Sequence, residues 1–565
     1  MGKLGGNRQF GTVAGAALAL LTLGSAQAAD IPSAAGAAPA PAVSATPWAW
    51  SFGAAFVTDY NFRGISQSAR GPAVQTSAEL TYTINPNWQL YANIFGSSVK
   101  LPSGPTMELD VSAGVRPSFG NLAFDFGFTR YGYPKENFNA LGGTINSDFM
   151  EYYGKVSYKF FDKLTIGGGI YHAPNWLNLG TYGTYYQATA ALELPHGFAI
   201  SGEYGHYALG RTSLSNSALV LGVPLPDYNY WNAGISYTYK SATIDLRYHD
   251  SSLSKFNCNV IVGDPRAIAG GSKWCGPAFI ASLKFSGSDK NLFGVDAPAA
   301  ADSGAVSPWA LAFGMSVMTD YNFRGISQSA RGAATQASAE LTYTINPNFQ
   351  IYANIFGSSV KLPSGPTMEL DVSAGVRPSF GNLAFDFGVT RYGYPKENFN
   401  ALGGTINSDF WEYYGKASYK FFDKLTIGAG IYHAPDWLNL GTAGTYYQGT
   451  AALELPHGFA VSGEYGHYTL GRTSFFNSAL VSNVPLPDYN YWNAGISYTY
   501  KSATVDLRYH DTDLSKFNCN VIVGDPRAIA GGSKWCGPAI VGSLKFNFTE
   551  KNFFGSAPAA VTAKY

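Results

Sequence analysis

The sequence predicts an all-β fold made of two tandem transmembrane barrels, each antiparallel, up-and-down and built from about 12 strands. Three observations predict this fold: a duplicated domain, segments in which apolar and polar side chains alternate, and connections that are alternately short and long. Charged residues make up 13% of the chain, about half of the roughly 25% usual for soluble domains. Such a composition is typical of a sheet with lipid on one side and a polar lumen on the other.

The duplication is visible in one stretch. Residues 59–68 read DYNFRGISQS, and the same residues return at 320–329, an offset of 261 positions. The offset also relates Trp176 to Trp437 and Cys275 to Cys536. This period is far longer than that of a solenoid repeat, so it indicates a duplicated domain. We place the two copies at residues 48–285 and 309–548.

Each copy contains a series of segments with the period-two pattern of a strand. In residues 242–249, for example, Ile244, Leu246 and Tyr248 alternate with Asp245 and Arg247. Most segments are long enough for a tilted strand across a bilayer, which takes about 9–11 residues. The candidate strands of the first copy are residues 50–64, 78–84, 88–99, 108–116, 122–129, 150–160, 163–174, 186–194, 198–209, 230–239, 242–249 and 279–285.

The connections between these strands alternate in length. Residues 85–87, 120–121, 161–162, 196–197 and 240–241 form tight turns, whereas residues 135–147, 175–183, 210–226 and 254–278 form long loops. Short periplasmic turns opposite long external loops are typical of bacterial outer-membrane barrels. No window approaches the 18 consecutive apolar residues of a spanning helix. A closed barrel then remains as the membrane structure, because lipid cannot satisfy open strand edges.

The segments outside the two copies have other compositions. Lys3 and Arg8, an apolar run at 11–23 and the Ala26-Gln27-Ala28 site predict a signal peptide at residues 1–28, cleaved on export. Residues 29–47 are rich in Ala and Pro and predict a disordered lead-in. We interpret residues 286–308 as a linker and residues 549–565 as a C-terminal tail. The predicted location is the outer membrane of a Gram-negative bacterium.

Two closures are compatible with the duplication: two barrels of 12 strands, or one barrel of 24 strands. Each copy carries its own first and last strand, so each can close alone. A linker of some 20 residues is also much longer than the turn of a hairpin. We therefore favour two barrels.

Residues 58–68, TDYNFRGISQS, resemble the N-terminal signature of the TorF-type porin family (the Gcw_chp family). The later segments Glu108-Leu109-Asp110-Val111 and Glu151-Tyr152-Tyr153 are also similar to strands of that family. The resemblance covers each copy nearly end to end, and it implies a bacterial outer-membrane barrel that conducts solutes. The chain departs from the expected pattern because it carries two copies and a cysteine pair in a late loop of each.

Charged residues on the polar faces are the candidate pore-lining residues. Rings of such charges set which ions enter a pore, although each charge can also simply pair with a neighbour across the strands. Arg63 and Gly64 fall where the first strand is expected to leave the membrane. There Arg63 lines the mouth or pairs with a carboxylate, and Gly64 permits a bulge. The candidates are Asp59, Arg63, Glu79, Glu108, Asp110, Arg116, Asp125, Glu151, Lys155, Glu193, Glu203, Asp245, Arg247, Asp320, Arg324, Asp506 and Arg508.

The cysteines predict one disulfide in the last long loop of each copy, Cys258 with Cys275 and Cys519 with Cys536. The histidines show no HxH or HExxH spacing, so we expect no metal and no cofactor. Aromatic residues at strand ends predict girdles at the level of the lipid headgroups. The residues are Trp48, Trp50, Tyr131, Tyr133, Trp176, Tyr182, Tyr185, Tyr228, Tyr230 and Trp231.

The expected function is passive diffusion of small hydrophilic solutes through a polar lumen. Twelve strands lie between filled eight-stranded barrels and open sixteen-stranded ones, so the pore should be narrow. One alternative is a non-conducting barrel that binds a partner through its external loops. Another is a lipid-modifying enzyme, but no G-x-S-x-G elbow occurs and we expect no enzymatic activity. The expected partners are outer-membrane lipid and small solutes, without nucleic acid, since 37 basic residues balance 37 acidic ones.

Overall fold

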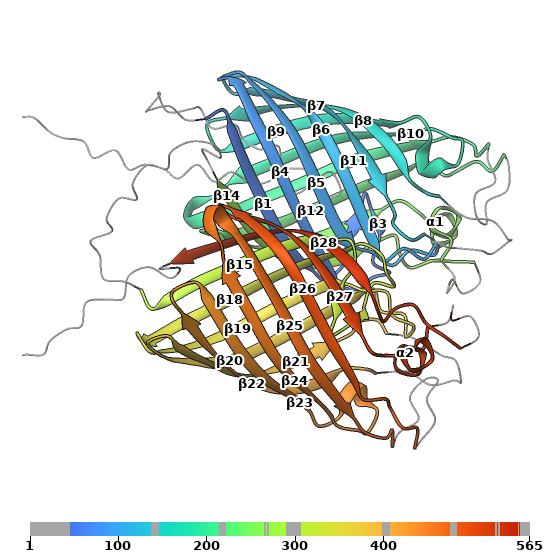
Figure 1. Cartoon of the computed structure of the whole chain (residues 1–565). Helices are drawn as coiled ribbons and strands as arrows, with labels where there is room; N and C mark the ends of the chain where they lie inside the picture. Colours follow the sequence, from blue (N-terminus) through green and yellow to red (C-terminus); the bar gives the residue numbers. More distant parts are fainter. Residues whose placement is uncertain are drawn as a thin grey trace, which may run out of the picture.

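The structure, a computed structural model, describes residues 46–136, 146–213, 222–264, 267, 270–289, 307–397, 407–474, 483–525, 528, 531–551 and 553. In these residues the chain forms two closed antiparallel barrels of 12 strands each, which lie side by side (Figure 1). The predicted fold class is confirmed. The predicted signal peptide, most of the predicted lead-in and linker, and most of the predicted tail lie outside the described residues.

Strands of the first barrel run from the N-terminal to the C-terminal end of the first copy. They are β1 Trp48–Val57, β4 Ala73–Asn85, β5 Trp88–Ser98, β6 Met107–Phe119, β7 Leu122–Gly132, β8 Phe149–Phe160, β9 Leu164–Ala173, β10 Gly183–Glu193, β11 Phe198–Leu209, β12 Tyr228–Tyr239, β13 Ala242–Ser251 and β14 Ala278–Asp289.

The second barrel repeats this order. Its strands are β15 Trp309–Met318, β18 Ala334–Asn346, β19 Phe349–Ser359, β20 Met368–Phe380, β21 Leu383–Gly393, β22 Phe410–Phe421, β23 Leu425–Ala434, β24 Gly444–Glu454, β25 Phe459–Leu470, β26 Tyr489–Tyr500, β27 Ala503–Thr512 and β28 Ala539–Lys551.

Each copy closes on itself through its first strand. Phe52 of β1 is paired with Ala78 of β4 on one side and with Gly287 of β14 on the other. In the second copy β15 pairs in the same way with β18 and β28. The alternative of a single barrel with 24 strands is therefore wrong.

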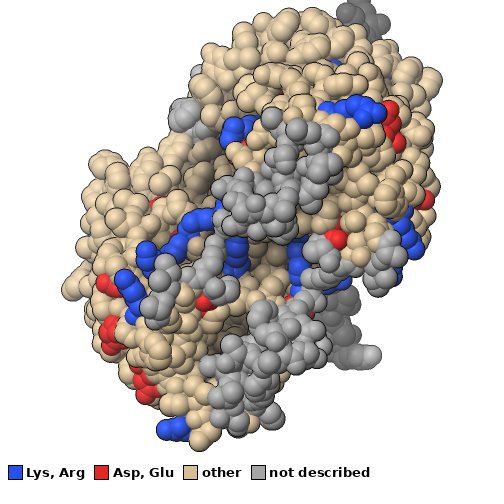
Figure 2. All heavy atoms as spheres, turned by 90° about the vertical axis from the view of Figure 1, so that its right-hand side faces the viewer, with Lys and Arg blue, Asp and Glu red and all other residues tan. Residues whose placement is uncertain are grey.

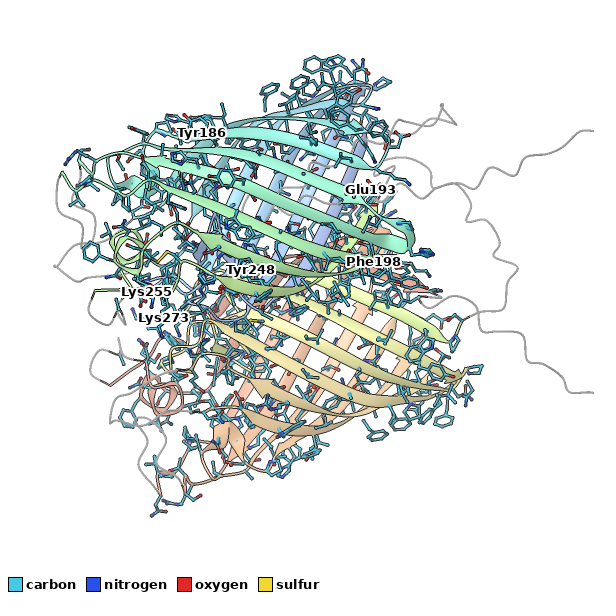
Figure 3. All side chains as sticks on the ribbon, turned by 180° about the vertical axis from the view of Figure 1, so that it is seen from behind. Tyr186, Glu193, Phe198, Tyr248, Lys255 and Lys273 are labelled. Atoms are coloured by element: carbon cyan, nitrogen blue, oxygen red, sulfur yellow. A yellow bond between two sulfur atoms is a disulfide. The ribbon has the colours of Figure 1, made fainter. Side chains whose placement is uncertain are left out.

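The two ends of each barrel differ, as the alternating connections predict. Tight turns such as Gly120-Asn121 and Lys240-Ser241 join strands at one end, here called the turn end. The long connections, including helices α1 (Lys255–Val262) and α2 (Lys516–Val523), lie at the other, the loop end. Figure 3 shows Lys255 and Lys273 at the loop end, with Glu193 and Phe198 at the opposite end.

Among the described residues, no helix is long and apolar enough to cross a membrane.

Alternation along the strands separates an apolar outer surface from a polar interior. Outward-facing Ile170, Tyr186 and Leu246 are about half exposed, at 53%, 47% and 54%, and Figure 3 shows Tyr186 on the outside of the sheet. Inward-facing Glu151 and Thr129 are fully buried. An exposed apolar band around a buried polar interior is the surface that lipid requires.

The structure corrects the predicted first strand, residues 50–64. β1 ends at Val57, and the chain then turns into the barrel instead of leaving the membrane. There it forms the small hairpin of β2 (Asn61–Phe62) and β3 (Ile65–Ser66). Arg63 and Gly64 at its tip have φ angles of 47° and 88°, which end an extended strand. β14 and β28 also continue beyond the expected ends of the copies, to Asp289 and Lys551.

A crosslink across the closing seam tests the barrel count. Val57 and Ser282 are paired on β1 and β14, so the double variant Val57→Cys/Ser282→Cys should form a disulfide within the first copy. The matched control is Val57→Cys/Ser543→Cys, because Ser543 is the equivalent residue of β28. Mobility on a non-reducing gel after proteolysis in the linker reports the result. Crosslinking of the control pair alone would contradict the two-barrel fold.

Candidate functional site

The candidate functional site is the interior of each barrel, which a segment of the chain itself enters. We call residues 58–72, between β1 and β4, the inner segment of the first barrel, and residues 319–333 that of the second. Most inner-segment residues are buried, and Ile65 belongs to one apolar cluster with Tyr131, Trp176 and Trp274. The inner segment therefore occupies part of the loop-end half of the lumen.

At the tip of the inner segment lies a buried ion pair. Arg63 donates to both carboxylate oxygens of Glu151 on β8, at 2.7 and 2.8 Å. Its side chain is 6% exposed and that of Glu151 is 0% exposed. Tyr131 donates a further hydrogen bond of 3.1 Å to the carboxylate. The two-pronged geometry is the strongest that an arginine and a carboxylate can form.

Aromatic rings surround this guanidinium. The ring centroids of Phe62, Tyr171, Tyr185 and Tyr207 lie 4.7, 4.7, 4.3 and 5.2 Å from Cζ of Arg63. Such cation–π contacts contribute about 0.5–2 kcal/mol each, more when water is excluded. The rings come from β2, β9, β10 and β11, so Arg63 ties the inner segment to strands on the far side of the lumen.

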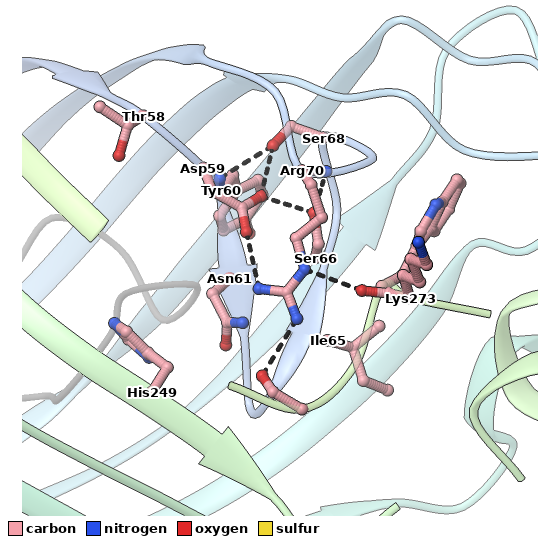
Figure 4. Close-up of polar contacts among 12 residues, drawn as sticks. Thr58, Asp59, Tyr60, Asn61, Ile65, Ser66, Ser68, Arg70, His249 and Lys273 are labelled. Carbon is pink, nitrogen blue, oxygen red and sulfur yellow. Dashed lines mark hydrogen bonds and ion pairs between the residues drawn. The ribbon is translucent and has the colours of Figure 1, made fainter. Parts of the chain in front are cut away.

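The base of the inner segment is held by a second polar network around Asp59 (Figure 4). Ser66 and Ser68 donate to its Oδ1 at 2.5 and 2.9 Å, and Arg70 forms an ion pair of 3.1 Å with Oδ2. Burial raises the pKa of the Asp59 carboxyl, while the hydrogen bond from Ser66 and the charge of Arg70 oppose that shift. These contacts hold the hairpin of β2 and β3 in place, because they connect Asp59 before the hairpin with Ser68 and Arg70 after it.

The disulfide loop covers the inner segment from the loop end. The predicted pair Cys258–Cys275 is formed, as is Cys519–Cys536. Arg70 donates to the carbonyl oxygens of Lys273 and Gly276 at 3.0 Å each. The backbone N–H of Ser66 donates to the carbonyl of Trp274 at 2.8 Å. The disulfide therefore anchors the residues that hold the inner segment in place.

Two buried carboxylates lie beside the inner segment. Glu108 accepts a hydrogen bond of 2.7 Å from the hydroxyl of Tyr60. Asp110, two residues further on β6, is 1% exposed, and its oxygens make no hydrogen bond to any described residue. Tyr60 points into the lumen, because the chain turns inward after Val57.

Closer to the turn end, a second group of charges spans the lumen. Arg116 donates to both oxygens of Glu79 at 2.7 and 2.8 Å, and its guanidinium lies 3.7 Å from the ring centre of Tyr91. Asp125 pairs with Lys155 at 3.1 Å and with Arg116 at 3.6 Å. These charges compensate one another, so this level of the lumen is polar but close to neutral.

A third group lies on the wall formed by β11–β13. Arg247 pairs with Asp245 at 3.0 Å and donates to Asn232 at 2.7 Å. Asn232 in turn donates to Glu203 at 3.1 Å, and Glu203 also accepts a hydrogen bond of 2.5 Å from Tyr185. Through Tyr185, this group reaches the aromatic rings around Arg63.

The second barrel repeats the arrangement. Arg324 donates to both oxygens of Glu412 at 2.7 and 2.9 Å, Asp320 pairs with Arg331 at 3.1 Å, and Asp506 pairs with Arg508 at 3.1 Å. Some charged side chains of the second barrel are more exposed than their equivalents in the first barrel. The side chain of Arg377, the equivalent of Arg116, is 33% exposed, compared with 20% for Arg116.

Most of the predicted lumen charges therefore meet in three groups of pairs. Glu193 lies apart, half-exposed at the turn end and paired with Lys159 at 3.0 Å. Arg63 does not line a mouth. It is buried inside the barrel and pairs with Glu151, which was one of the two alternatives left open by the sequence.

The sequence interpretation missed the aromatic interior. Tyr131, Tyr133, Trp176, Tyr185, Tyr228 and Tyr230, predicted as headgroup girdles, are all buried in the lumen cluster. The alternation of outward and inward side chains along each strand could have revealed these buried aromatic residues. Ile170 and Tyr186 face outward, so Tyr171 and Tyr185 beside them must face inward.

Two cavities accompany these groups. One of about 630 Å³ opens at the loop end of the second barrel and is lined by Phe323, Leu362, Tyr394, Trp437, Tyr489 and Val523 among others. Figure 2 shows this end of the molecule, hollowed in its lower part. The other, of about 30 Å³, lies in the first lumen between Asp59 and Arg247. Within the described residues, no group of three His, Cys, Asp or Glu side chains is placed to hold a metal ion.

Comparisons with known proteins identify one family. The model of the family described as "Bacterial protein of unknown function (Gcw_chp)" matches residues 41–261 and again residues 302–527. A search of the curated proteins found no match to this chain.

Solved structures with some likeness include an iron transporter and a siderophore receptor. The FrpB iron transporter from Neisseria meningitidis is 9% identical, with a TM-score of 0.32 over 89% of this chain and 81% of that one. The siderophore receptor PirA from Pseudomonas aeruginosa is 10% identical, with a TM-score of 0.31 over 89% and 80%. At TM-scores this low, iron and siderophore handling stay properties of those proteins.

Removing the carboxylate partner of the buried arginine should destabilise each barrel. Glu151→Ala/Glu412→Ala leaves Arg63 and Arg324 buried and unpaired, which costs about 3–5 kcal/mol per barrel. The control Arg130→Ala/Arg391→Ala removes ion pairs in which the arginines are 58% and 48% exposed, worth at most about 1 kcal/mol. Urea unfolding of the two variants compares these costs. Equal midpoints for both variants would contradict the ion-pair assignment.

Breaking the disulfide should loosen the inner segment. In Cys258→Ser/Cys275→Ser the loop loses a covalent constraint worth about 3 kcal/mol for its length, so the bond from Ser66 to Trp274 should open more often. Hydrogen exchange at the Ser66 amide is expected to accelerate. The equivalent amide of Ser327, which bonds to Trp535, serves as the internal control. Unchanged exchange at Ser66 would show that the loop does not hold the inner segment.

Proposed function

This chain belongs to the Gcw_chp family of bacterial proteins, as two tandem copies, and from that premise we propose that each copy is an outer-membrane channel for small hydrophilic solutes. The observation that carries the proposal is the interior of the barrel. Beside the aromatic cluster around Arg63, it contains charged and hydroxyl-bearing side chains, many of them in ion pairs, while the outer surface is apolar. A polar interior of this kind suits the passage of water and small solutes.

In this proposal, the inner segment is the gate. Arg63 and Glu151 close the loop-end half of the lumen, and the charges at the level of Arg116 can exchange partners without leaving the lumen. Opening requires the inner segment to move away from β8, which breaks one two-pronged ion pair and several cation–π contacts. The described conformation then corresponds to a closed channel, and the loop end to the cell exterior.

Several features support gating by this segment. Arg63 has a positive φ of 47°, a conformation that non-glycine residues adopt only when their surroundings impose it. Gly64 packs so closely that a Cβ would lie 2.9 Å from Cβ of Ser251. The closed position therefore depends on a few specific contacts, and the loss of these contacts favours release.

Bilayer recordings test the gate. Purified wild-type protein should show small or rare conductance steps, and Arg63→Ala/Arg324→Ala should show larger or more frequent ones, because the inner segment loses its anchor on β8. The control Arg130→Ala/Arg391→Ala changes exposed arginines and should behave like the wild type. Silence from all three proteins, each shown to be folded by its mobility on an unheated gel, would overturn the channel proposal.

A second candidate function is supported by the cavity of about 630 Å³ at the loop end of the second barrel. Its walls are mostly aromatic and aliphatic, as in many small-molecule sites, and this favours a non-conducting barrel that binds an apolar ligand at the cell surface. Binding of an apolar fluorescent dye without conductance steps would favour this function over the channel. For neither candidate do we propose an enzymatic reaction.

A further inference from the structure

One face of each barrel does not meet lipid. The outward sides of β1, β4 and β5 lie against β15, β18 and β19 of the other barrel. There Phe52, Ala54 and Val74 are fully buried, although they occupy the same outward positions that elsewhere leave Ile170 53% exposed. The two barrels share one apolar cluster across this face.

The contacts at the loop end are reciprocal. Nζ of Lys100 in the first copy donates to the carbonyl oxygen of Gly365 in the second, at 2.8 Å. Lys361, which is Lys100 shifted by the repeat of 261 residues, donates to the carbonyl of Gly104 at 2.7 Å. Gly365 is likewise the shifted equivalent of Gly104. In Figure 2, lysines and arginines gather near the middle of this end.

The turn end shows the same reciprocity. The hydroxyl of Ser241 donates to Glu550 at 2.5 Å, and the hydroxyl of its equivalent, Ser502, donates to Asp289, the equivalent of Glu550. The backbone N–H groups of both serines point to the same carboxylates, at 3.4 and 3.2 Å. Corresponding contacts therefore join the barrels at both ends of this face.

In the middle of the face, a residue meets its own equivalent. The rings of Phe52 and Phe313 lie 5.8 Å apart. Beside them, the hydroxyl groups of Thr76 and Thr335 form a hydrogen bond, although Thr335 is the equivalent of Val74 and not of Thr76. Small residues permit the close approach. A Cβ on Gly96 would lie 3.0 Å from Oγ1 of Thr335, and small residues are what membrane-embedded surfaces use to pack closely.

Reciprocal contacts of this kind define a two-fold, isologous interface. We infer that this face, formed by β1, β4 and β5 with the ends of β14 and β28, is a binding surface for a second copy of the barrel. The two copies hold each other non-covalently through it, and the linker is not needed for the pairing. The chain is thus a dimer of barrels joined into one polypeptide.

The two copies have diverged on this face so that each fits the other. Strands β6 and β20 are identical, as are β12 and β26, whereas β1 differs from β15 and β14 from β28. Gly287 corresponds to Phe548, and these equivalents face each other, because a Cβ on Gly287 would lie 3.2 Å from the Phe548 ring. At this position one glycine faces one phenylalanine, and the single ring fills the space between the two barrels. Two first copies would leave a hole there, and two second copies would clash.

Cleavage of the linker tests the inference in the full chain. A protease site is inserted between residues 290 and 306, the chain is purified in mild detergent and cut, and native mass spectrometry measures the product. The halves should stay together at the mass of the uncut chain. Separation of two halves that each keep the gel mobility of a folded barrel would overturn the proposal.

Two matched variants locate the surface that holds the halves. Ala54→Trp adds a large ring inside the shared cluster and should separate the cut halves, whereas Ala190→Trp adds the same ring on β10, where alanine faces lipid, and should not. Gly287→Phe places two phenylalanines where one fits and should weaken the pairing as well. Continued association of both interface variants would overturn the proposal.

A crosslink keeps the test valid if Ala54→Trp fails to fold. Thr76→Cys/Thr335→Cys joins two residues already in contact, so a disulfide should link the cut halves. The control pair Ala190→Cys/Ala451→Cys, which are equivalent lipid-facing positions, should not crosslink. Absence of the first crosslink, or formation of the second alone, would contradict the interface.

Discussion

The structure depends on one constraint: in lipid, every backbone N–H and C=O of a strand needs a partner within the protein. β1 meets that need by pairing with β4 on one side and β14 on the other. Because each copy closes on itself, each barrel has 12 strands. A barrel with this number of strands has a narrow lumen. Because the first strand of each copy is paired on both sides within that copy, the chain forms two barrels and not one.

A narrow lumen limits what its side chains can do. A charge enclosed there is costly unless a partner lies nearby, and many of the inward charges of each copy accordingly form ion pairs, whereas Glu108 and Asp110 are two buried carboxyl groups beside the inner segment. Arg63 is the clearest case, since it is enclosed by aromatic rings and held by Glu151. The same constraint makes the inner segment suitable as a gate. Its tip is held by an ion pair and cation–π contacts, and Ile65 packs in the apolar cluster of the lumen.

Because the domain is duplicated, each barrel has one outer face that packs against the other barrel, and the rest of its outer surface has a different environment. Much of the outer surface is exposed and apolar, but the face around Phe52 and Phe313 packs against the other copy. That face is where the copies have diverged, whereas strands such as β6 and β20 have stayed identical. A shared interface changes in pairs, because a larger residue on one side needs a smaller one opposite.

The sequence by itself determined the barrels. Period-two alternation, turn spacing and the repeat located the long strands, the sidedness of Asp245 and Arg247, and the loop disulfides, because these depend on local geometry and short-range spacing. Only the tertiary structure decided that the chain turns inward after Val57, that Tyr185 lies in the lumen and that Ala54 is covered by a second barrel. An extended segment looks the same in sequence whether it continues as a strand or folds back, and an outward alanine looks the same against lipid or protein. These outcomes depend on residues such as Glu151 and Phe313, which are distant in sequence and become neighbours only when both barrels have closed.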